Sequence, residues 1–200
     1  MILAVLCAAA PFSPAQTDLQ SRDGYIRRQG DTWIFGTSQV EKQVRLADGR
    51  FFLSSLRNKV SGHEYQDGKT PPDEIRFLAG GLDASSSSWR WKLHSEHVTK
   101  LSQAELQLDI ELESSGLRVT KSYVIYPGSS VVREWLTLEN VSNKPVHLSH
   151  VDFLHSRLLG SVASELKLNY LTGGGNFNGS QLLKTEATNP EYQRTFDSNG

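Results

Sequence analysis

Four residues of one short stretch carry side chains that could together bind zinc: His147, His150, Asp152 and His155. In an extended strand, successive side chains point to opposite faces, so His150 and Asp152 share one face and the other two histidines share the opposite one. A zinc site requires three or four convergent ligands. The spacing therefore predicts exposed or hydrogen-bonded histidines and no metal site. His94 and His97 are also expected on opposite faces of a strand, with the same consequence.

The sequence does not contain the motifs that common classes of hydrolase use. A serine nucleophile of the α/β-hydrolase type would stand in a G-x-S-x-G turn, which does not occur. The stretch TGGGNFNGS is rich in glycine, but no Lys-Ser or Lys-Thr follows it, so it does not match a phosphate-binding loop. Carboxylates fall on the water-facing positions of alternating strands, and nothing singles out the flanking pair that glycoside hydrolysis uses. We predict no catalytic residue, no cofactor and no metal in these 200 residues.

Tryptophan side chains offer a further kind of site. Trp89 and Trp91 share a face in the stretch WRWKL, with Arg90 between them. Flat aromatic pairs stack on sugar rings, but they more often fill the core of a β-sandwich. We predict that both are core residues.

Composition narrows the class of protein. Lys and Arg number 21 and Asp and Glu 22, so the formal net charge is −1, and like charges form no long run. This balance argues against a nucleic-acid or membrane-surface partner. Hydrophobic residues make up 38% of the chain, which is enough for one sizeable core in a domain of this length.

The first residues have the pattern of a secretion signal. The apolar run from Ile2 to Ala10 is too short to cross a bilayer, and Ser13 and Ala15 are small residues placed for cleavage before Gln16. We therefore expect residues 1–15 to be a signal peptide, residues 16–29 a flexible leader, and the protein to be exported to the periplasm or the outside of the cell. Cys7 is the single cysteine, so the mature chain would have neither a disulfide nor a thiolate nucleophile.

The remainder, residues 30–200, reads as one domain of ten to twelve short strands separated by turn residues. The clearest alternation is ELQLDIELE, in which Leu106, Leu108, Ile110 and Leu112 are predicted to face the core and the carboxylates to face water. ADGR after Leu46 is a strong turn signal. The stretch SRLLGSVASEL is the best short helix candidate. The pattern predicts an all-β fold, a large antiparallel sandwich with few or no helices.

Residues 131–153, VVREWLTLENVSNKPVHLSHVDF, alternate, break at an Asn-rich corner, and alternate again. Val132, Leu136 and Leu138 fall on one face of the first half, with Trp135 on the other. Asn and Ser bond to nearby backbone and Pro fixes its own φ, so the corner is a turn. We predict a β-hairpin or a close relative of one, with Trp135 and Leu138 in the core.

The order of these elements resembles the N-terminal β domain of glycoside hydrolase family 36, the α-galactosidase group. The resemblance runs over about residues 30–200, and the stretches that carry it are ADGRFFLSSLRNKVSGHEY, LQLDIELESSGLRVTKSYVIYPGSS followed by residues 131–153, and LTGGGNFNGSQLLKTE. It implies a β-supersandwich that precedes a (β/α)₈ barrel, and a retaining mechanism with two aspartates on that barrel. A barrel requires about 250 residues, so both aspartates would lie outside these residues. Phe177 stands where many members have Trp, which leaves α-linked sugars other than galactosides open.

This resemblance implies a non-catalytic domain of an exported α-galactosidase-like hydrolase. The expected partners are its own downstream barrel, an α-galactoside-type carbohydrate and further copies of the chain. Asn176, Phe177 and Asn178 are the candidates for residues near the substrate. The alternative is a stand-alone carbohydrate-binding or adhesion sandwich.

Overall fold

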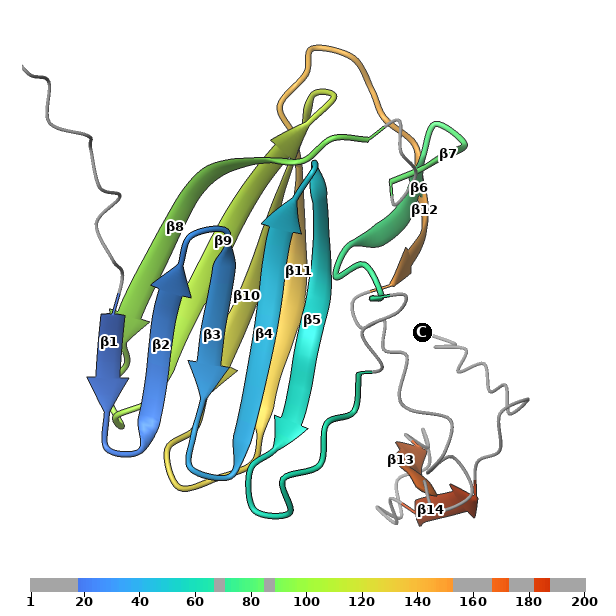
Figure 1. Ribbon diagram of the computed structural model, residues 1–200. Helices are drawn as coiled ribbons and strands as arrows, with labels where there is room; N and C mark the ends of the chain where they lie inside the picture. Colours follow the sequence, from blue (N-terminus) through green and yellow to red (C-terminus); the bar gives the residue numbers. More distant parts are fainter. Residues whose placement is uncertain (1–17, 67–70, 85–88, 153–166, 173–181, 188–200) are drawn as a thin grey trace, which may run out of the picture.

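The computed structural model describes residues 18–66, 71–84, 89–152, 167–172 and 182–187. These residues form fourteen strands in antiparallel sheets and no helix (Figure 1), which confirms the predicted all-β class. Nowhere in these ranges is there a helix with the length and apolar character needed to cross a membrane. The predicted helix candidate at residues 156–166 lies outside the described ranges.

The first sheet has five strands in chain order. They are β1 (Asp18–Ser21), β2 (Gly24–Gln29), β3 (Thr32–Gly36), β4 (Val40–Ala47) and β5 (Arg50–Asn58). The predicted ADGR turn joins β4 to β5: Asp48 and Gly49 have φ of 53° and 78°, as a two-residue hairpin turn with the strand twist requires. A Cβ on Gly49 would lie 2.9 Å from the Cβ of Arg90, so the close approach of Arg90 also favours glycine at this position.

The flexible leader predicted for residues 16–29 is wrong from residue 18 on, because β1 and β2 belong to this sheet. Ile26 is fully buried, and Leu19 packs partly against the core. These two apolar side chains explain why the segment is ordered into strands.

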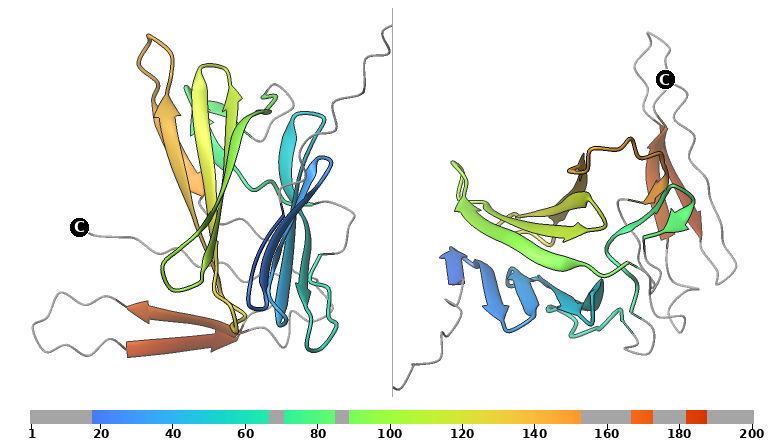
Figure 2. Two further views of the ribbon diagram at one scale, coloured as in Figure 1. Left: turned by 90° about the vertical axis from the view of Figure 1, so that its left-hand side faces the viewer. Right: turned by 90° about the horizontal axis from the view of Figure 1, so that it is seen from above.

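The second sheet has the order β11-β10-β9-β8. Its strands are β8 (Lys92–Lys100), β9 (Leu106–Ser114), β10 (Leu117–Ile125) and β11 (Val132–Asn140). The alternation of β9 confirms the predicted ladder: Leu106, Leu108, Ile110 and Leu112 have no exposed surface, whereas Gln107 and the acidic residues between them are partly exposed. The first and second sheets lie face to face as two layers (Figure 2), and the buried apolar residues fill the space between them.

A smaller sheet has the order β12-β6-β7 and consists of β12 (Leu148–Asp152), β6 (Arg76–Ala79) and β7 (Leu82–Asp83). A two-stranded sheet of β13 (Lys167–Thr172) and β14 (Leu182–Ala187) lies further along the chain. The hairpin predicted for residues 131–153 is wrong, because β11 pairs with β10 and β12 pairs with β6. The alternating pattern predicted both strands correctly, but it does not name a strand's partner. The corner instead carries the chain to the other sheet, where the amide of Gly80 donates to the carbonyl oxygen of His147 at 2.9 Å.

Aromatic side chains close the core beside the small sheet. Trp89 and Trp91 are 6% and 4% exposed, which confirms them as core residues. The Phe77 ring meets the two indoles edge-on, with centroids 5.9 and 6.3 Å away.

Replacing a residue of the β9 ladder should destabilise the protein strongly. Leu108→Ala is expected to lower the free energy of unfolding by about 2–5 kcal/mol, because it leaves a cavity in the sealed core. The control Leu82→Ala removes a side chain that is 61% exposed and should change stability by about 0.5 kcal/mol or less. Urea denaturation followed by circular dichroism measures both; equal losses would contradict this placement of the core.

Candidate functional site

The fold brings ionisable side chains together between the two large sheets. Five of them converge from β4, from residues 72–75, from β10 and from β11: Lys42, Glu74, Lys121, Tyr123 and Glu134. We call these five residues the charge cluster. The four members that belong to strands stand at inward positions; Glu134, for instance, is paired with Tyr123 and therefore shares its face. Glu74 enters at the edge of the first sheet, where its amide donates to the carbonyl oxygen of Phe51 at 2.9 Å.

The two carboxylates of the charge cluster are bridged by the two ammonium groups. Lys42 Nζ lies 3.0 Å from Glu74 Oε1 and 2.9 Å from Glu134 Oε2. Lys121 Nζ lies 2.9 Å from Glu134 Oε2 and 3.7 Å from Glu74 Oε2. Tyr123 Oη donates a 2.7 Å hydrogen bond to Glu74 Oε2. The side chains of Lys42, Glu74 and Lys121 are 6%, 3% and 1% exposed, so these contacts form out of water.

The charges of this cluster set one another's protonation. Burial by itself would raise the pKa of Glu74, but Lys42, Lys121 and the Tyr123 hydroxyl outweigh it and hold that pKa below its usual value. Burial would likewise lower the pKa of Lys42, and the two glutamates outweigh it and raise that pKa. Burial, followed by the charges of Glu74 and Glu134, raises the pKa of Tyr123 well above its usual value. At neutral pH Glu74 is therefore an anion, Lys42 a cation and Tyr123 a neutral phenol.

This arrangement suits a structural role better than glycoside hydrolysis. A retaining glycosidase holds its two carboxyl groups about 5–5.5 Å apart with the sugar between them. Here the ammonium groups of Lys42 and Lys121 each contact both Glu74 and Glu134. The charge cluster connects the two sheets through ion pairs, and both carboxylates take part in them.

Sequence reasoning missed this cluster, although a signal was present. In β10 the inward positions are Leu117, Val119, Lys121, Tyr123 and Ile125, so a lysine interrupts an otherwise apolar face. In β11 Glu134 stands between Val132 and Leu136 in the same way. Opposite charges at inward positions of consecutive strands predict a buried ion pair.

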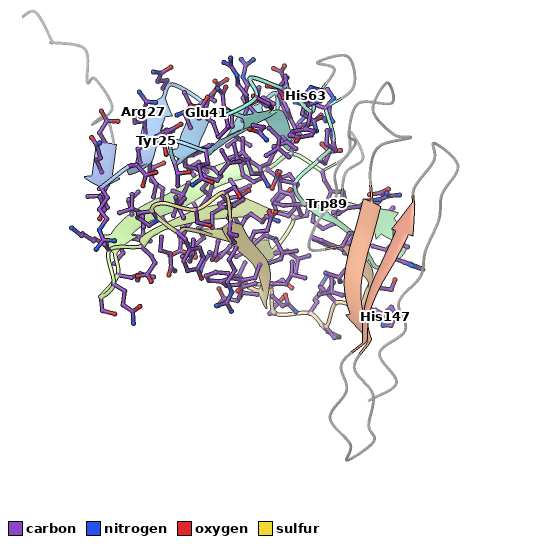
Figure 3. The ribbon with its side chains drawn as sticks, turned by 90° about the horizontal axis from the view of Figure 1, so that it is seen from below. Tyr25, Arg27, Glu41, His63, Trp89 and His147 are labelled. Carbon is purple, nitrogen blue, oxygen red and sulfur yellow. The ribbon has the colours of Figure 1, made fainter. Side chains whose placement is uncertain are left out.

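A second polar group lies on the outer face of the first sheet, around Tyr25 (Figure 3). The guanidinium of Arg27 and the Nζ of Lys59 lie 4.6 and 4.9 Å from the centre of the Tyr25 ring. The Tyr25 hydroxyl donates to Glu41, and burial together with that carboxylate raises the pKa of Tyr25. The phenol therefore stays protonated at neutral pH. A hollow of about 350 Å³ borders it, lined by Asp18, Leu19, Gln20, Tyr25 and Arg27.

The prediction that Trp135 lies in the core is wrong. Leu138, which was predicted with it, is partly buried and packs against the core. The indole is paired with Ser122 on β10 and lies on the outer face of the second sheet, partly exposed. Its neighbours in β11, Glu134 and Leu136, point inward. Because successive side chains of a strand point to opposite faces, Trp135 points outward. The indole borders an open hollow of about 300 Å³, lined by Leu101, Ser102, Gln103, Glu105, Gln107, Val124, Tyr126, Arg133 and Trp135. We call this the Trp135 hollow.

Bulges interrupt the regular alternation from which the histidine positions were predicted: one lies in β12 between Ser149 and Asp152, where His150 has a φ of 49°, and one lies in β8. A bulge between Leu93 and Ser95 moves His94 to the outer face of the second sheet, where its Nδ1 lies 3.4 Å from Glu113 Oε2. His97, paired with Asp109, lies on the same face, so the predicted opposite placement is wrong. Within the described residues, no group of three or more His, Cys, Asp or Glu side chains could hold a metal ion.

The predicted substrate-proximal residues Asn176, Phe177 and Asn178 lie outside the described residues, as does His155. In comparisons with known proteins, no family model, no curated protein and no solved structure matches the chain. The resemblance to glycoside hydrolase family 36 therefore stays a prediction that rests on the motifs in the sequence.

Removing one cation of the charge cluster should cost much more stability than removing a surface cation from the same strand. Lys42→Met is expected to lower the free energy of unfolding by about 3–5 kcal/mol, because it leaves buried carboxylates under-neutralised. The matched control is Arg45→Met, whose pair with Asp31 is 47% and 44% exposed and should contribute about 0–1 kcal/mol. Urea denaturation at pH 7 measures both variants, and similar losses would show that the cluster is not energetically special.

The contribution of Glu74 should also depend on pH. Its pKa is lowered by folding, so its ionic contribution is present above its usual value of 4.5 and is lost as the pH falls through the lower folded value. The stability difference between the wild type and Glu74→Gln should therefore be largest near neutral pH and shrink below pH 4.5. The control is Glu139→Gln, at a side chain that is 61% exposed. Thermal melts from pH 7 to pH 3 test this, and a Glu74 difference that stays constant would contradict it.

Proposed function

We propose that this chain is the non-catalytic N-terminal β-sandwich domain of an exported α-galactosidase-like glycoside hydrolase, where it supports a catalytic (β/α)₈ barrel. The family resemblance of the sequence over residues 30–200 suggests this role. The antiparallel two-layer architecture agrees with the β domain that such a resemblance implies. Export follows from the signal-like pattern of residues 1–15.

The non-catalytic part of the proposal rests on the ion pairs that the two carboxylates of the charge cluster make. Glu74 and Glu134 converge in the described core, and lysine ammonium groups bridge them at 2.9–3.7 Å. A carboxylate pair held in this way cannot flank a sugar ring as retaining hydrolysis requires. Catalysis is therefore assigned to the barrel, and the rigid sandwich to its support.

The alternative hypothesis, a stand-alone carbohydrate-binding or adhesion sandwich, draws on the partly exposed indole of the Trp135 hollow. The two functions differ in what the gene encodes after Gly200. A pattern of alternating strands and helices there favours the hydrolase, and a stop codon favours the binding module.

The activity assay compares this chain with the product of the longer gene on a panel of nitrophenyl α-glycosides. The 200-residue chain is expected to hydrolyse none of them, and the longer product to hydrolyse the α-galactoside. Turnover by the short chain that disappears when one of its own carboxylates is replaced would overturn the non-catalytic assignment. Silence from both proteins would overturn the hydrolase proposal and favour the binding module.

A further inference from the structure

We propose that the Trp135 hollow, on the outer face of the second sheet, is a binding site for a neutral sugar ring. Only the choice of an α-galactoside as the first sugar to test rests on the proposed function.

The aromatic part of the site is Trp135. The other three tryptophans, Trp33, Trp89 and Trp91, are 1%, 6% and 4% exposed and belong to the core, whereas Trp135 is partly exposed beside an open hollow. Its strand places it on the outer face, next to the buried side chain of Val124, and Tyr126 adds a second aromatic ring to the lining. An accessible aromatic face can pack against the apolar C–H face of a sugar, and aromatic groups with a few placed polar groups are typical of ligand sites.

The polar part of the site comes from Glu105, Gln107 and Arg133. The amide nitrogen of Gln107 donates to both carboxylate oxygens of Asp109, at 3.1 and 2.8 Å, which leaves its carbonyl oxygen as an acceptor for a ligand. The Glu105 carboxylate accepts a 3.1 Å hydrogen bond from the backbone N–H of Gln103. The Arg133 guanidinium lies 5.3 Å from the centre of the Trp135 ring. These contacts restrain the side chains before any ligand arrives, which lowers the entropic cost of binding.

The balance of charge favours a neutral polyhydroxylated ligand over an anion. The lining has one guanidinium, from Arg133, and one carboxylate, from Glu105, so the two charges offset each other. Carboxylate, amide and guanidinium groups together offer both acceptors and donors, which matches hydroxyl groups that both donate and accept. A volume of about 300 Å³ lies at the lower end of the range for ligand pockets and suits a small ring.

Two other hollows fit a sugar less well. At the Tyr25 hollow, two cations lie over the aromatic ring, those of Arg27 and Lys59, whereas at Trp135 one does, that of Arg133. A larger groove of about 600 Å³ has no Trp, Tyr or Phe side chain and is lined by Arg90, Lys92, Leu93, His94, Glu113, Ser114 and Ser115. The Trp135 hollow thus combines an accessible indole with restrained polar groups.

The test is a titration of the 200-residue chain with methyl α-galactoside and with the trisaccharide raffinose, followed by tryptophan emission and by ligand-observed NMR. Because the other three tryptophans are buried, a change in emission and in quenching by acrylamide reports chiefly on Trp135. We expect saturable binding. Trp135→Ala should weaken it at least about tenfold in the NMR measurement, the equivalent of about 1.4 kcal/mol.

The matched control is Thr137→Ala, at an exposed residue on the same strand and the same face but outside the lining of the hollow, which should bind like the wild type. If Trp135→Ala fails to fold, Gln107→Ala and Arg133→Ala test the same hollow, and each should weaken binding. Binding that survives unchanged in all folded variants, or equal binding of glycerol, would overturn the site. Absence of sugar binding while the longer gene product hydrolyses α-galactosides would overturn this site alone and leave the proposed function standing.

Discussion

Two lysines and two glutamates meet between the sheets, and the alignment of four separate segments depends on their contact. Lys42 comes from the first sheet, Lys121 and Glu134 from the second, and Glu74 from the segment that leads into the small sheet. Each ion loses several kcal/mol of hydration when it is buried, and only close, well-paired geometry offsets that loss. A displacement of the sheets would separate the paired charges and leave them buried without partners, which costs several kcal/mol. The charge cluster therefore restricts how the sheets can be aligned, in a way that the leucine ladder of β9 alone does not.

The pairing of the buried charges also distinguishes the ionisable groups of the interior from the polar groups on the outer faces. The ionisable groups of the interior are bound to one another, and Tyr123 completes them with its hydroxyl on Glu74. The outer faces carry the groups that remain open to ligands, and on the second sheet these include the partly exposed Trp135.

The strands themselves could be predicted from the sequence, because alternation is a local property. The ladder from Leu106 to Leu112, the turn at Asp48 and Gly49, and the core position of Trp89 and Trp91 all follow from residue type and spacing. The partner of β12 could not be predicted, since its alternating pattern is the same whether it pairs with β11 or with β6. The bulge at His94 could not be predicted from the sequence either. The position of Trp135 follows from alternation rather than from hydrophobicity: Glu134 and Leu136 on either side of it point inward, so the indole lies on the outer face.

The pairing of β12 with β6 also bears on the order in which the chain folds. Ala79 and Leu148 are partners, and the whole of β8 to β11 lies between them in the sequence. Those four strands form a meander in which each strand pairs with the next, so their contacts close short loops. Bringing β12 back to β6 closes a long loop, and its entropic cost is reduced once the meander has already drawn the ends together. We expect the small sheet to assemble late, as the step that locks a preformed second layer onto the rest of the sandwich.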